Sequence, residues 1–422
     1  MRDVAARLAR NVAWLGLGEI LLKGALFGAG VVVARGLGPA AMGAFTVAYG
    51  AAMLLTLVLA AGQPEVLIRE TARAPKTASP LYAISRAWRR RLAIVVLPVA
   101  AVGAMLVPDL TLRWVLVAFI PYAWFRSSLI SVGASFKGLD RMEVEVGGRA
   151  VELGVALLLL IAVARLGAHV WTTGVVFSVG AAAGLAVVLR QLRRLPRDAA
   201  TPVTRAFLAR EGMVFLFLGL SLQASLRTDT FMLAGFGVPK EEIGRYGVAG
   251  ALVWGLLGVA QLLAVAMYPT VSKAVAGGGL HYRRVAGIAL GGALVGVGLA
   301  TMLTLFRSPL VRLVFGPQYE VSARLVRVLA WALPGACVAM MLGVVVAACG
   351  RQLWSLMNQC AVLATSAVGN LVAIPRWGTA GSAAVAVAAW GVALVGSTAV
   401  VALALRRPKR TEVPVAPGTE WE

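Results

Sequence analysis

Three cationic side chains occur inside stretches of sequence that are otherwise apolar enough to cross a membrane. They are Lys23, Arg126 and Arg227. A charge in hydrocarbon is costly, so such residues usually face a polar pathway or a partner. Arginine offers a planar bidentate donor and lysine a compact point charge, and both suit phosphate-like anions. The three cations therefore predict a polar path through an apolar protein and an anionic cargo on it.

Two acidic residues lie close to these cations along the chain. Glu19 precedes Lys23 by four residues, so the two share a helix face and can pair. Asp229 follows Arg227 by two residues, which places them on different sides of a continuous helix. Arg126 has no acid three or four residues away. We predict that all three cations bind the anion, with Arg126 and Arg227 as the stronger pair.

The same acids leave other interpretations open. Glu19 and Asp229 are the candidates for coupling transport to H⁺ or Na⁺, whereas a Glu19–Lys23 pair that only neutralises two buried charges is the plainer alternative. A static salt bridge between helices is the corresponding alternative for Arg227. Glu152 is expected nearer the cytoplasmic end of its span and is not counted among the deep acids.

The composition sets the class of protein. The chain has 422 residues, 60% hydrophobic and only 14% charged, with a mean hydropathy of +0.85. A soluble protein carries more charge, so we expect an all-α integral membrane protein. The net charge of +22 then reports orientation rather than nucleic-acid binding. The three cysteines form no C-x-x-C pair, and we expect neither a metal site nor a cofactor.

Apolar runs predict twelve transmembrane helices. Most of the 40 Lys and Arg residues fall on one side if the N-terminus is cytoplasmic, so both termini are predicted inside a bacterial cytoplasmic (inner) membrane. The first run, interrupted by Glu19 and Lys23, is taken as an uncleaved span. The predicted spans are 12–34, 41–62, 92–107, 114–136, 147–164, 169–189, 211–235, 246–269, 285–306, 325–349, 353–374 and 379–405.

Short matches between the two halves indicate an internal repeat. Leu37–Ala48 aligns with Val238–Ala249, which pairs Met42-Gly43 with Ile243-Gly244. Two further matches follow in the same order, Gly138 with Gly350 and Arg165-Leu-Gly167 with Arg376-Trp-Gly378. A repeat of six spans is parallel, about an axis along the membrane normal. We expect two six-helix lobes, residues 1–200 and 201–405, and a cytoplasmic tail, residues 406–422.

Several segments carry a resemblance to a known family. They are ARNVAWLGLGEILLKG, VVVARGLGPAAMGAF and AGQPEVLIRETAR near the N-terminus, FKGLDRMEVEVGGRAVE, and LRTDTFMLAGFGVPKEEIGRYGVA. In these the chain resembles the Wzx-type polysaccharide-unit flippases of the multidrug/oligosaccharidyl-lipid/polysaccharide (MOP) exporter superfamily. The resemblance implies a MATE-like fold of two lobes in a V around a central cavity. It also implies a polyprenyl-pyrophosphate-linked oligosaccharide as the cargo in surface polysaccharide biosynthesis.

Other functions remain as alternatives. A cation-coupled multidrug exporter of the same superfamily would favour an unpaired deep carboxylate, and Asp229 keeps that alternative open. A membrane enzyme would favour a large outer loop with paired catalytic groups, but the outer loops are short and their acids scattered. We therefore predict a transporter, not an enzyme, whose partners are the lipid-linked glycan, the membrane and H⁺ or Na⁺.

Overall fold

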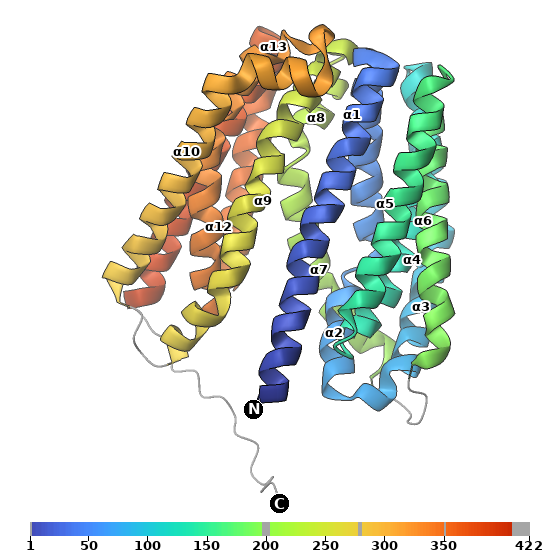
Figure 1. Cartoon of the computed structure of the whole chain (residues 1–422), viewed down its shortest axis with the longest axis vertical. Helices are drawn as coiled ribbons and strands as arrows, with labels where there is room; N and C mark the ends of the chain where they lie inside the picture. Colours follow the sequence, from blue (N-terminus) through green and yellow to red (C-terminus); the bar gives the residue numbers. More distant parts are fainter. Residues whose placement is uncertain (1, 196–202, 277–280, 350–351, 407–422) are drawn as a thin grey trace, which may run out of the picture.

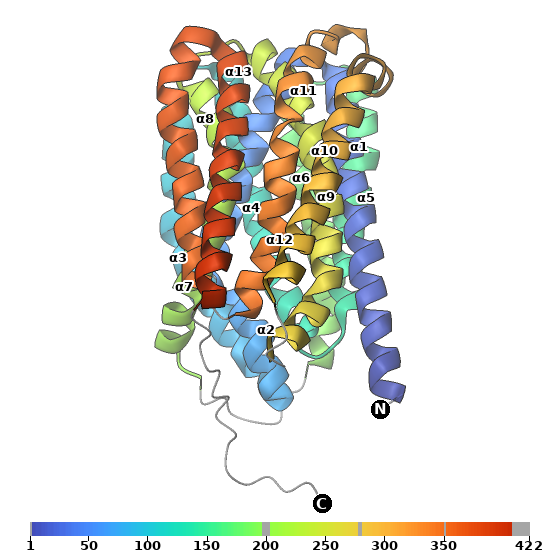
Figure 2. The same ribbon diagram turned by 90° about the vertical axis from the view of Figure 1, so that its left-hand side faces the viewer.

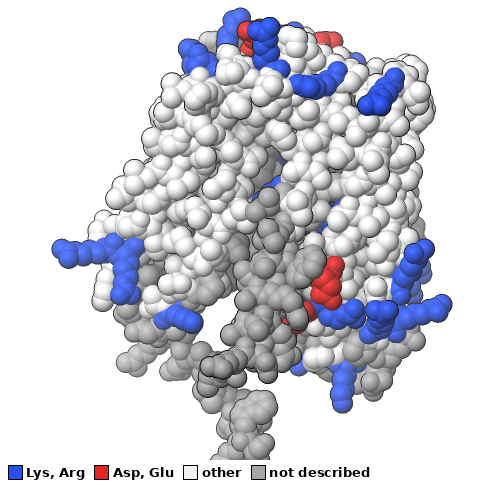
Figure 3. Space-filling view, in the orientation of Figure 1, with Lys and Arg blue, Asp and Glu red and all other residues white. Residues whose placement is uncertain are grey.

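The computed structural model describes residues 2–195, 203–276, 281–349 and 352–406. These residues form a bundle of long helices, and no strand occurs among them (Figure 1). Lys and Arg side chains gather at the two ends of the face in Figure 3, and the belt between them is almost uncharged. The predicted all-α membrane class is confirmed, and the chain is a multi-pass membrane protein.

The helices fall into two groups along the chain. The first group holds α1 (Arg2–Ala60), α2 (Gln63–Arg73), α3 (Ala78–Met105), α4 (Leu110–Lys137), α5 (Met142–Arg165) and α6 (Thr172–Gln191). The second group holds α7 (Arg205–Ser225), α8 (Thr228–Gly235), α9 (Lys240–Ala276), α10 (Tyr282–Phe315), α11 (Ser322–Leu329), α12 (Ala332–Ala348) and α13 (Gln352–Arg406). The predicted lobe boundary and the predicted tail, apart from Arg406, lie outside the described residues.

The predicted count of twelve spans can be compared with the number of helices that are long and apolar enough to cross a membrane. Eight helices of the described chain are long and apolar enough to cross a membrane, or nine if α11 and α12, bent by 42°, form one span. Two of the eight are double-length, because α1 and α13 run through breaks at Gly38 and Gly378. Most of the predicted span 92–107 lies in α3, which ends at Met105. The part of α3 before this span was predicted to be cytoplasmic, and it carries Arg86, Arg89, Arg90 and Arg91.

One predicted span, residues 211–235, is not a continuous helix. Residues 211–235 were expected to form a single helix, but the structure ends α7 at Ser225 and begins α8 at Thr228. Arg227 lies in this break with φ −129° and ψ −10°. Irregular backbone at membrane depth is tolerated where it lines a cavity, and this break gives the first indication of where the cavity is.

The two groups of helices lie side by side, with α1 between them. Figures 1 and 2 show α1 beginning and α13 ending at the same end of the bundle, as an even number of spans requires. One continuous apolar core joins residues of both groups, and α1 packs on α4, α5 and α9. The two groups are therefore joined chiefly through the long first helix.

A reciprocal contact of two glycines brings α1 and α9 close together. A Cβ added to Gly43 would lie 2.0 Å from the carbonyl oxygen of Lys240, four residues before Gly244. A Cβ added to Gly244 would lie 2.0 Å from the carbonyl oxygen of Pro39, four residues before Gly43. The segments that the sequence aligned as repeats thus meet each other, in the symmetric way expected for contact about a two-fold axis.

The third match of the predicted repeat has a shared backbone feature. Gly167 and Gly378 both have a left-handed backbone, with φ of 61° and 55°. Such φ values favour glycine, because a side chain there would be strained. Gly138 begins the turn after α4, whereas its predicted counterpart Gly350 lies outside the described residues.

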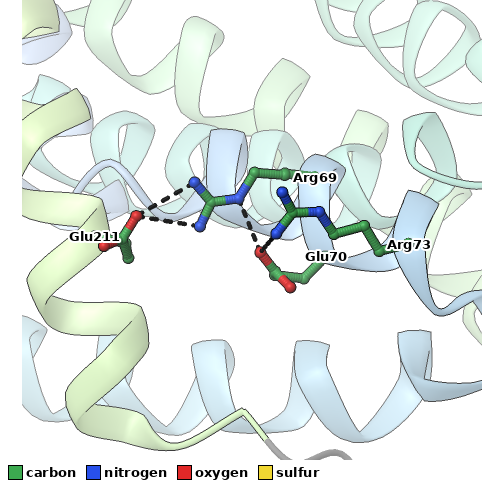
Figure 4. A network of polar contacts seen from close by, with 4 residues as sticks. All are labelled: Arg69, Glu70, Arg73 and Glu211. Atoms are coloured by element: carbon green, nitrogen blue, oxygen red, sulfur yellow. Dashed lines mark hydrogen bonds and ion pairs between the residues drawn. The ribbon is translucent and has the colours of Figure 1, made fainter. Parts of the chain in front are cut away.

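Ion pairs join the groups at both ends of the bundle. At the end away from the termini, Lys240 contacts Asp109 at 2.8 Å. Partial burial raises the pKa of Asp109, but hydrogen bonds from Lys240 and the Leu112 N–H outweigh it and hold that pKa below its usual value. At the other end, Arg69 of α2 donates to Glu70 and, at 3.2 Å, to Glu211 of α7 (Figure 4).

We predict that Gly43→Ala and Gly244→Ala each destabilise the protein. A methyl group 2.0 Å from a carbonyl oxygen forces the helices apart, and overpacking of this kind costs about 1–3 kcal/mol. Thermal unfolding in detergent should therefore begin several degrees lower in both variants. Gly298→Ala is the matched control, because nothing lies within 4 Å of its added Cβ. Unchanged melting of both variants would show that the glycine contact is not required.

Candidate functional site

Two of the three predicted cations line one cavity between the helical groups. Lys23 comes from α1 and Arg227 from the break between α7 and α8, and together with residues of α9 they surround about 300 Å³. The face drawn in Figure 3 is hollowed between the two groups, and blue side-chain atoms lie inside that hollow. The third cation, Arg126, is not among the residues that line this cavity.

Arg227 is held by an aromatic ring rather than by a carboxylate. Its guanidinium carbon lies 5.9 Å from the ring centroid of Tyr49, within the range of a cation–π contact. Tyr49 is in turn fixed by ring contacts with Phe119, Tyr122 and Phe177. Among the described residues Arg227 forms no salt bridge, and it lines the cavity.

Asp229 lines the same cavity but its carboxylate already has partners. The Tyr246 hydroxyl donates to one oxygen, and the backbone N–H of Thr230 donates to the other at 2.8 Å. The spacing of Asp229 and Arg227 predicted different sides of a continuous helix. The break between α7 and α8 removes that restriction, so both side chains reach the cavity.

Arg126 forms an ion pair inside the first helical group. Its guanidinium donates to Glu152 of α5, and the Glu152 side chain is only 1% exposed. Glu152 was expected closer to the cytoplasmic end of its span, where it would pair with Arg149 or reach lipid headgroups; its carboxylate is instead buried against Arg126. The two residues are 26 positions apart, so no local pattern revealed the pair. A buried charge with a bonded partner has a structural role already, which separates Arg126 from the two cavity cations.

Lys23 occupies a more central place than the sequence indicated. It lines the cavity of Arg227, a second one of about 560 Å³ and a third of about 390 Å³. Its ammonium group donates to the side-chain oxygen of Gln261 in α9. The side chain of Glu19, its predicted neighbour, lies outside the described residues. Lys23 is thus the residue at which three cavities meet.

The three cavities differ in chemistry. The first holds Lys23, Arg227 and Asp229 among aromatic rings. The second shares Lys23 and Arg227 with the first but is otherwise lined by amide and hydroxyl side chains, two tryptophans and apolar residues. The third, between α1, α9 and α10, is apolar except for Lys23. Charged, neutral polar and apolar surroundings therefore converge on one ammonium group.

Sequence reasoning missed the neutral polar residues of this site. Uncharged polar side chains in apolar spans give a weaker signal than charges, because they are common as contacts between membrane helices. Among the aromatic residues, Trp254 lines two cavities, whereas Tyr122 is 1% exposed and packs in the core. The missed cavity residues are Tyr246, Gln261, Ser355, Asn358, Gln359 and Trp390.

The described part of the chain offers no group of three His, Cys, Asp or Glu side chains that could hold a metal ion. The site is therefore built from cations, amides and rings. Such groups bind an anion or a sugar by electrostatics and hydrogen bonding, and they need no covalent chemistry.

Comparison with known families identifies the chain. Residues 8–275 match the family described as polysaccharide biosynthesis protein. The chain belongs to this family. The match covers the first helical group, α7, α8 and almost all of α9, and so includes Lys23, Arg126, Arg227 and Asp229. No curated protein matches the chain.

Solved structures show the fold of this polysaccharide biosynthesis family member. An inward-facing multidrug resistance MATE transporter of the MOP superfamily is similar, with 15% identity, a TM-score of 0.68, and coverage of 91% of this chain and 95% of that one. The lipid II flippase MurJ, in an inward closed conformation, gives 12% identity, a TM-score of 0.62, and coverage of 91% and 87%.

A third neighbour is a MOP superfamily transporter from Pyrococcus furiosus whose binding pocket has reversed polarity. It shares 16% identity with a TM-score of 0.66, and the match covers 94% of this chain and 96% of that one. The predicted MOP superfamily resemblance and MATE-like fold are confirmed. The polysaccharide biosynthesis family member thus shares its fold with membrane transporters and with a flippase.

We predict that Glu152→Gln destabilises the protein strongly. The change leaves the Arg126 guanidinium buried without its anion, and breaking a buried ion pair costs about 3–5 kcal/mol. The double variant Arg126→Gln/Glu152→Gln should recover most of that loss, because neither partner then carries an unpaired charge. The measurement is thermal unfolding of the purified protein.

Glu143→Gln is the control, since Glu143 lies on the same helix but its side chain is 49% exposed. It should melt within about a degree of the unmodified protein, as a surface pair contributes little. If Glu152→Gln melted normally while transport was lost, the pair would have a functional role instead of a structural one.

Proposed function

We propose that the chain is a flippase that moves a polyprenyl-pyrophosphate-linked oligosaccharide across the bacterial cytoplasmic membrane for surface polysaccharide biosynthesis. The observation that carries the proposal is the position of Lys23, where a cationic, an amide-lined and an apolar cavity meet. A lipid-linked glycan has the same three parts in sequence: a sugar, a pyrophosphate and a hydrocarbon chain. The family match supports the proposal independently.

Lys23 and Arg227 are proposed to hold the pyrophosphate. Both line the first and second cavities, so an anion between them is within reach of a point charge and a bidentate donor. The prenyl chain would lie along the apolar third cavity, beside Leu252, Leu303 and Leu310. Arg126, which the sequence favoured for this role, would act indirectly by fixing the helices behind Tyr49.

Alternating access is proposed as the mechanism, with the two helical groups acting as lobes. With both termini proposed to be cytoplasmic, the glycine contact of α1 with α9 and the Lys240–Asp109 pair would close the outer end, which lies away from the termini. Carrying an anion outward is also favoured by an inside-negative potential, by about 2.3 kcal/mol per charge per 100 mV. The potential alone could therefore give transport its direction.

A cation-coupled multidrug exporter is the second candidate. Its support is Asp229, a carboxylate that lines the cavity, and the MATE transporters among the structural neighbours. Against it, the carboxylate is bonded by Tyr246 and Thr230, and two cations share the same cavity. A cationic drug would be repelled by those charges, so the flippase is the better supported function.

We predict that Lys23→Gln/Arg227→Gln abolishes export of the glycan. In a strain lacking the gene, the unmodified chain should restore surface polysaccharide, whereas this variant should leave it more than about tenfold lower, since charge-assisted hydrogen bonds are worth about 1.5–3 kcal/mol each. Lipid-linked glycan should accumulate inside. Arg324→Gln, which removes an exposed cation of α11, is the control and should restore export fully. Normal export by the double variant would refute the assigned site.

We predict that the membrane potential drives the outward step. In proteoliposomes, an inside-negative diffusion potential should accelerate flipping of a fluorescent prenyl-pyrophosphate sugar several-fold over zero potential. The Asp229→Asn variant tests coupling to H⁺ or Na⁺, because it removes the one cavity carboxylate seen among the described residues. If this variant lost its response to ion gradients but kept the response to potential, Asp229 would be the coupling group. If the rate of flipping by the unmodified protein changed with neither the membrane potential nor an ion gradient, the proposed driving force would be refuted.

A further inference from the structure

The second cavity is the one with the most uncharged polar side chains among the three that meet at Lys23. It encloses about 560 Å³ and is lined by four amide side chains from three helices. Within it no carboxylate occurs among the described lining residues, and the two cations, Lys23 and Arg227, stand where it joins the first cavity. Each amide supplies both donors and an acceptor. The amides are Gln223 of α7, Gln261 of α9, and Asn358 and Gln359 of α13.

Two of these amides have their hydrogen-bonding groups available. Gln223 and Gln359 form no hydrogen bond with any other residue in the described ranges. Polar groups in a membrane protein normally find partners on neighbouring helices, because unpaired groups are costly away from water. Unpaired amides that line a cavity are consistent with a ligand that bonds to them.

Asn358 is oriented by its surroundings. Its side-chain nitrogen donates to the Ser397 hydroxyl at 3.0 Å and to the Ala393 carbonyl at 3.2 Å. Its side-chain oxygen lies 1.9 Å from where a Cβ on Gly396 would be, so only glycine at that position leaves room for the amide. The amide is thus fixed by a specific small residue and two acceptors, as in a preorganised binding site.

Aromatic rings complete the cavity. Trp254 and Trp390 both line it, with ring centroids 5.9 Å apart and planes inclined by 43°. Trp254 also lines the first cavity, so it stands at the entrance beside the two cations. Aromatic and amide side chains together match the apolar faces and hydroxyl edges of a sugar ring.

We propose that this amide-lined cavity is a subsite for an uncharged sugar, the residue linked directly to the pyrophosphate. The inference rests on the proposed flippase function and adds a selectivity to it. The pyrophosphate lies between Lys23 and Arg227, and the sugar enters the cavity past Trp254 to bond with Asn358, Gln359 and Gln223. A sugar bearing a carboxylate would lose hydration there without gaining a cation beyond the two that hold the pyrophosphate.

Binding of soluble probes to the purified full-length protein tests the subsite. The probes are farnesyl pyrophosphate and its conjugates with glucose, galactose, N-acetylglucosamine or glucuronic acid. At least one uncharged-sugar conjugate should bind about tenfold more tightly than farnesyl pyrophosphate, the size of one or two hydrogen bonds in a cavity. The glucuronic acid conjugate should show no such gain.

The variants Asn358→Leu and Gly396→Ala should each remove about three- to tenfold of the gain from the sugar, by deleting or displacing the same amide. Their affinity for farnesyl pyrophosphate should stay within twofold, which also reports that they are folded. Thr398→Val, an exposed position on the same helix, is the control and should leave both affinities unchanged. Arg227→Gln should weaken every probe alike.

The outcomes separate the two proposals. If the protein bound all the probes equally, or if Asn358→Leu weakened farnesyl pyrophosphate as much as its conjugates, the sugar subsite would be refuted while the pyrophosphate site stood. Tighter binding of the glucuronic acid conjugate would refute the preference for an uncharged sugar. If no probe bound at all, the proposed function itself would fail, and the subsite with it.

Discussion

The contact between Gly43 and Gly244 sets how closely α1 and α9 approach each other. Each glycine lies against a carbonyl oxygen of the opposite helix. A Cβ atom on either residue would lie only 2.0 Å from that oxygen, so neither position has room for a side chain. The contact continues one turn along α1 and α9, where Thr46 meets Gly247. Those two residues already line the first cavity. The cavity therefore opens directly from the point at which the helices are closest, and its width there depends on the absence of two side chains.

Charged groups inside this bundle are accommodated in two different ways. Arg126 and Glu152 satisfy each other within the first group of helices, so the pair stabilises packing and leaves little charge for a ligand. Arg227 instead lies in a helix break, over the ring of Tyr49, with its donors toward a cavity. An unpaired charge in an apolar setting is tolerable only where water or a ligand completes it. This contrast is what distinguishes a structural arginine from one available to cargo.

The surroundings of Lys23 explain how one site could hold a molecule with three unlike parts. A lipid-linked glycan cannot be bound by a uniformly polar or uniformly apolar pocket, since each part would face the wrong environment. Here the apolar surface lies between α1, α9 and α10, while the amides belong to α7, α9 and α13. Because α9 and Lys23 border both, a shift of α1 against α9 would change all three environments together.

The sequence by itself determined the membrane class, the all-helical fold and the three cations inside apolar stretches, and it predicted a repeat. These follow from composition, hydropathy and local spacing, which depend on neighbouring residues alone. Only the tertiary structure decided which cations are free. Glu152 is 26 residues from Arg126, and Gln261 is 238 residues from Lys23, so neither contact leaves a local pattern. The break at Arg227 was hidden for a related reason: no glycine or proline occurs at residues 225–230 to mark it, and only the backbone shows where the helix stops.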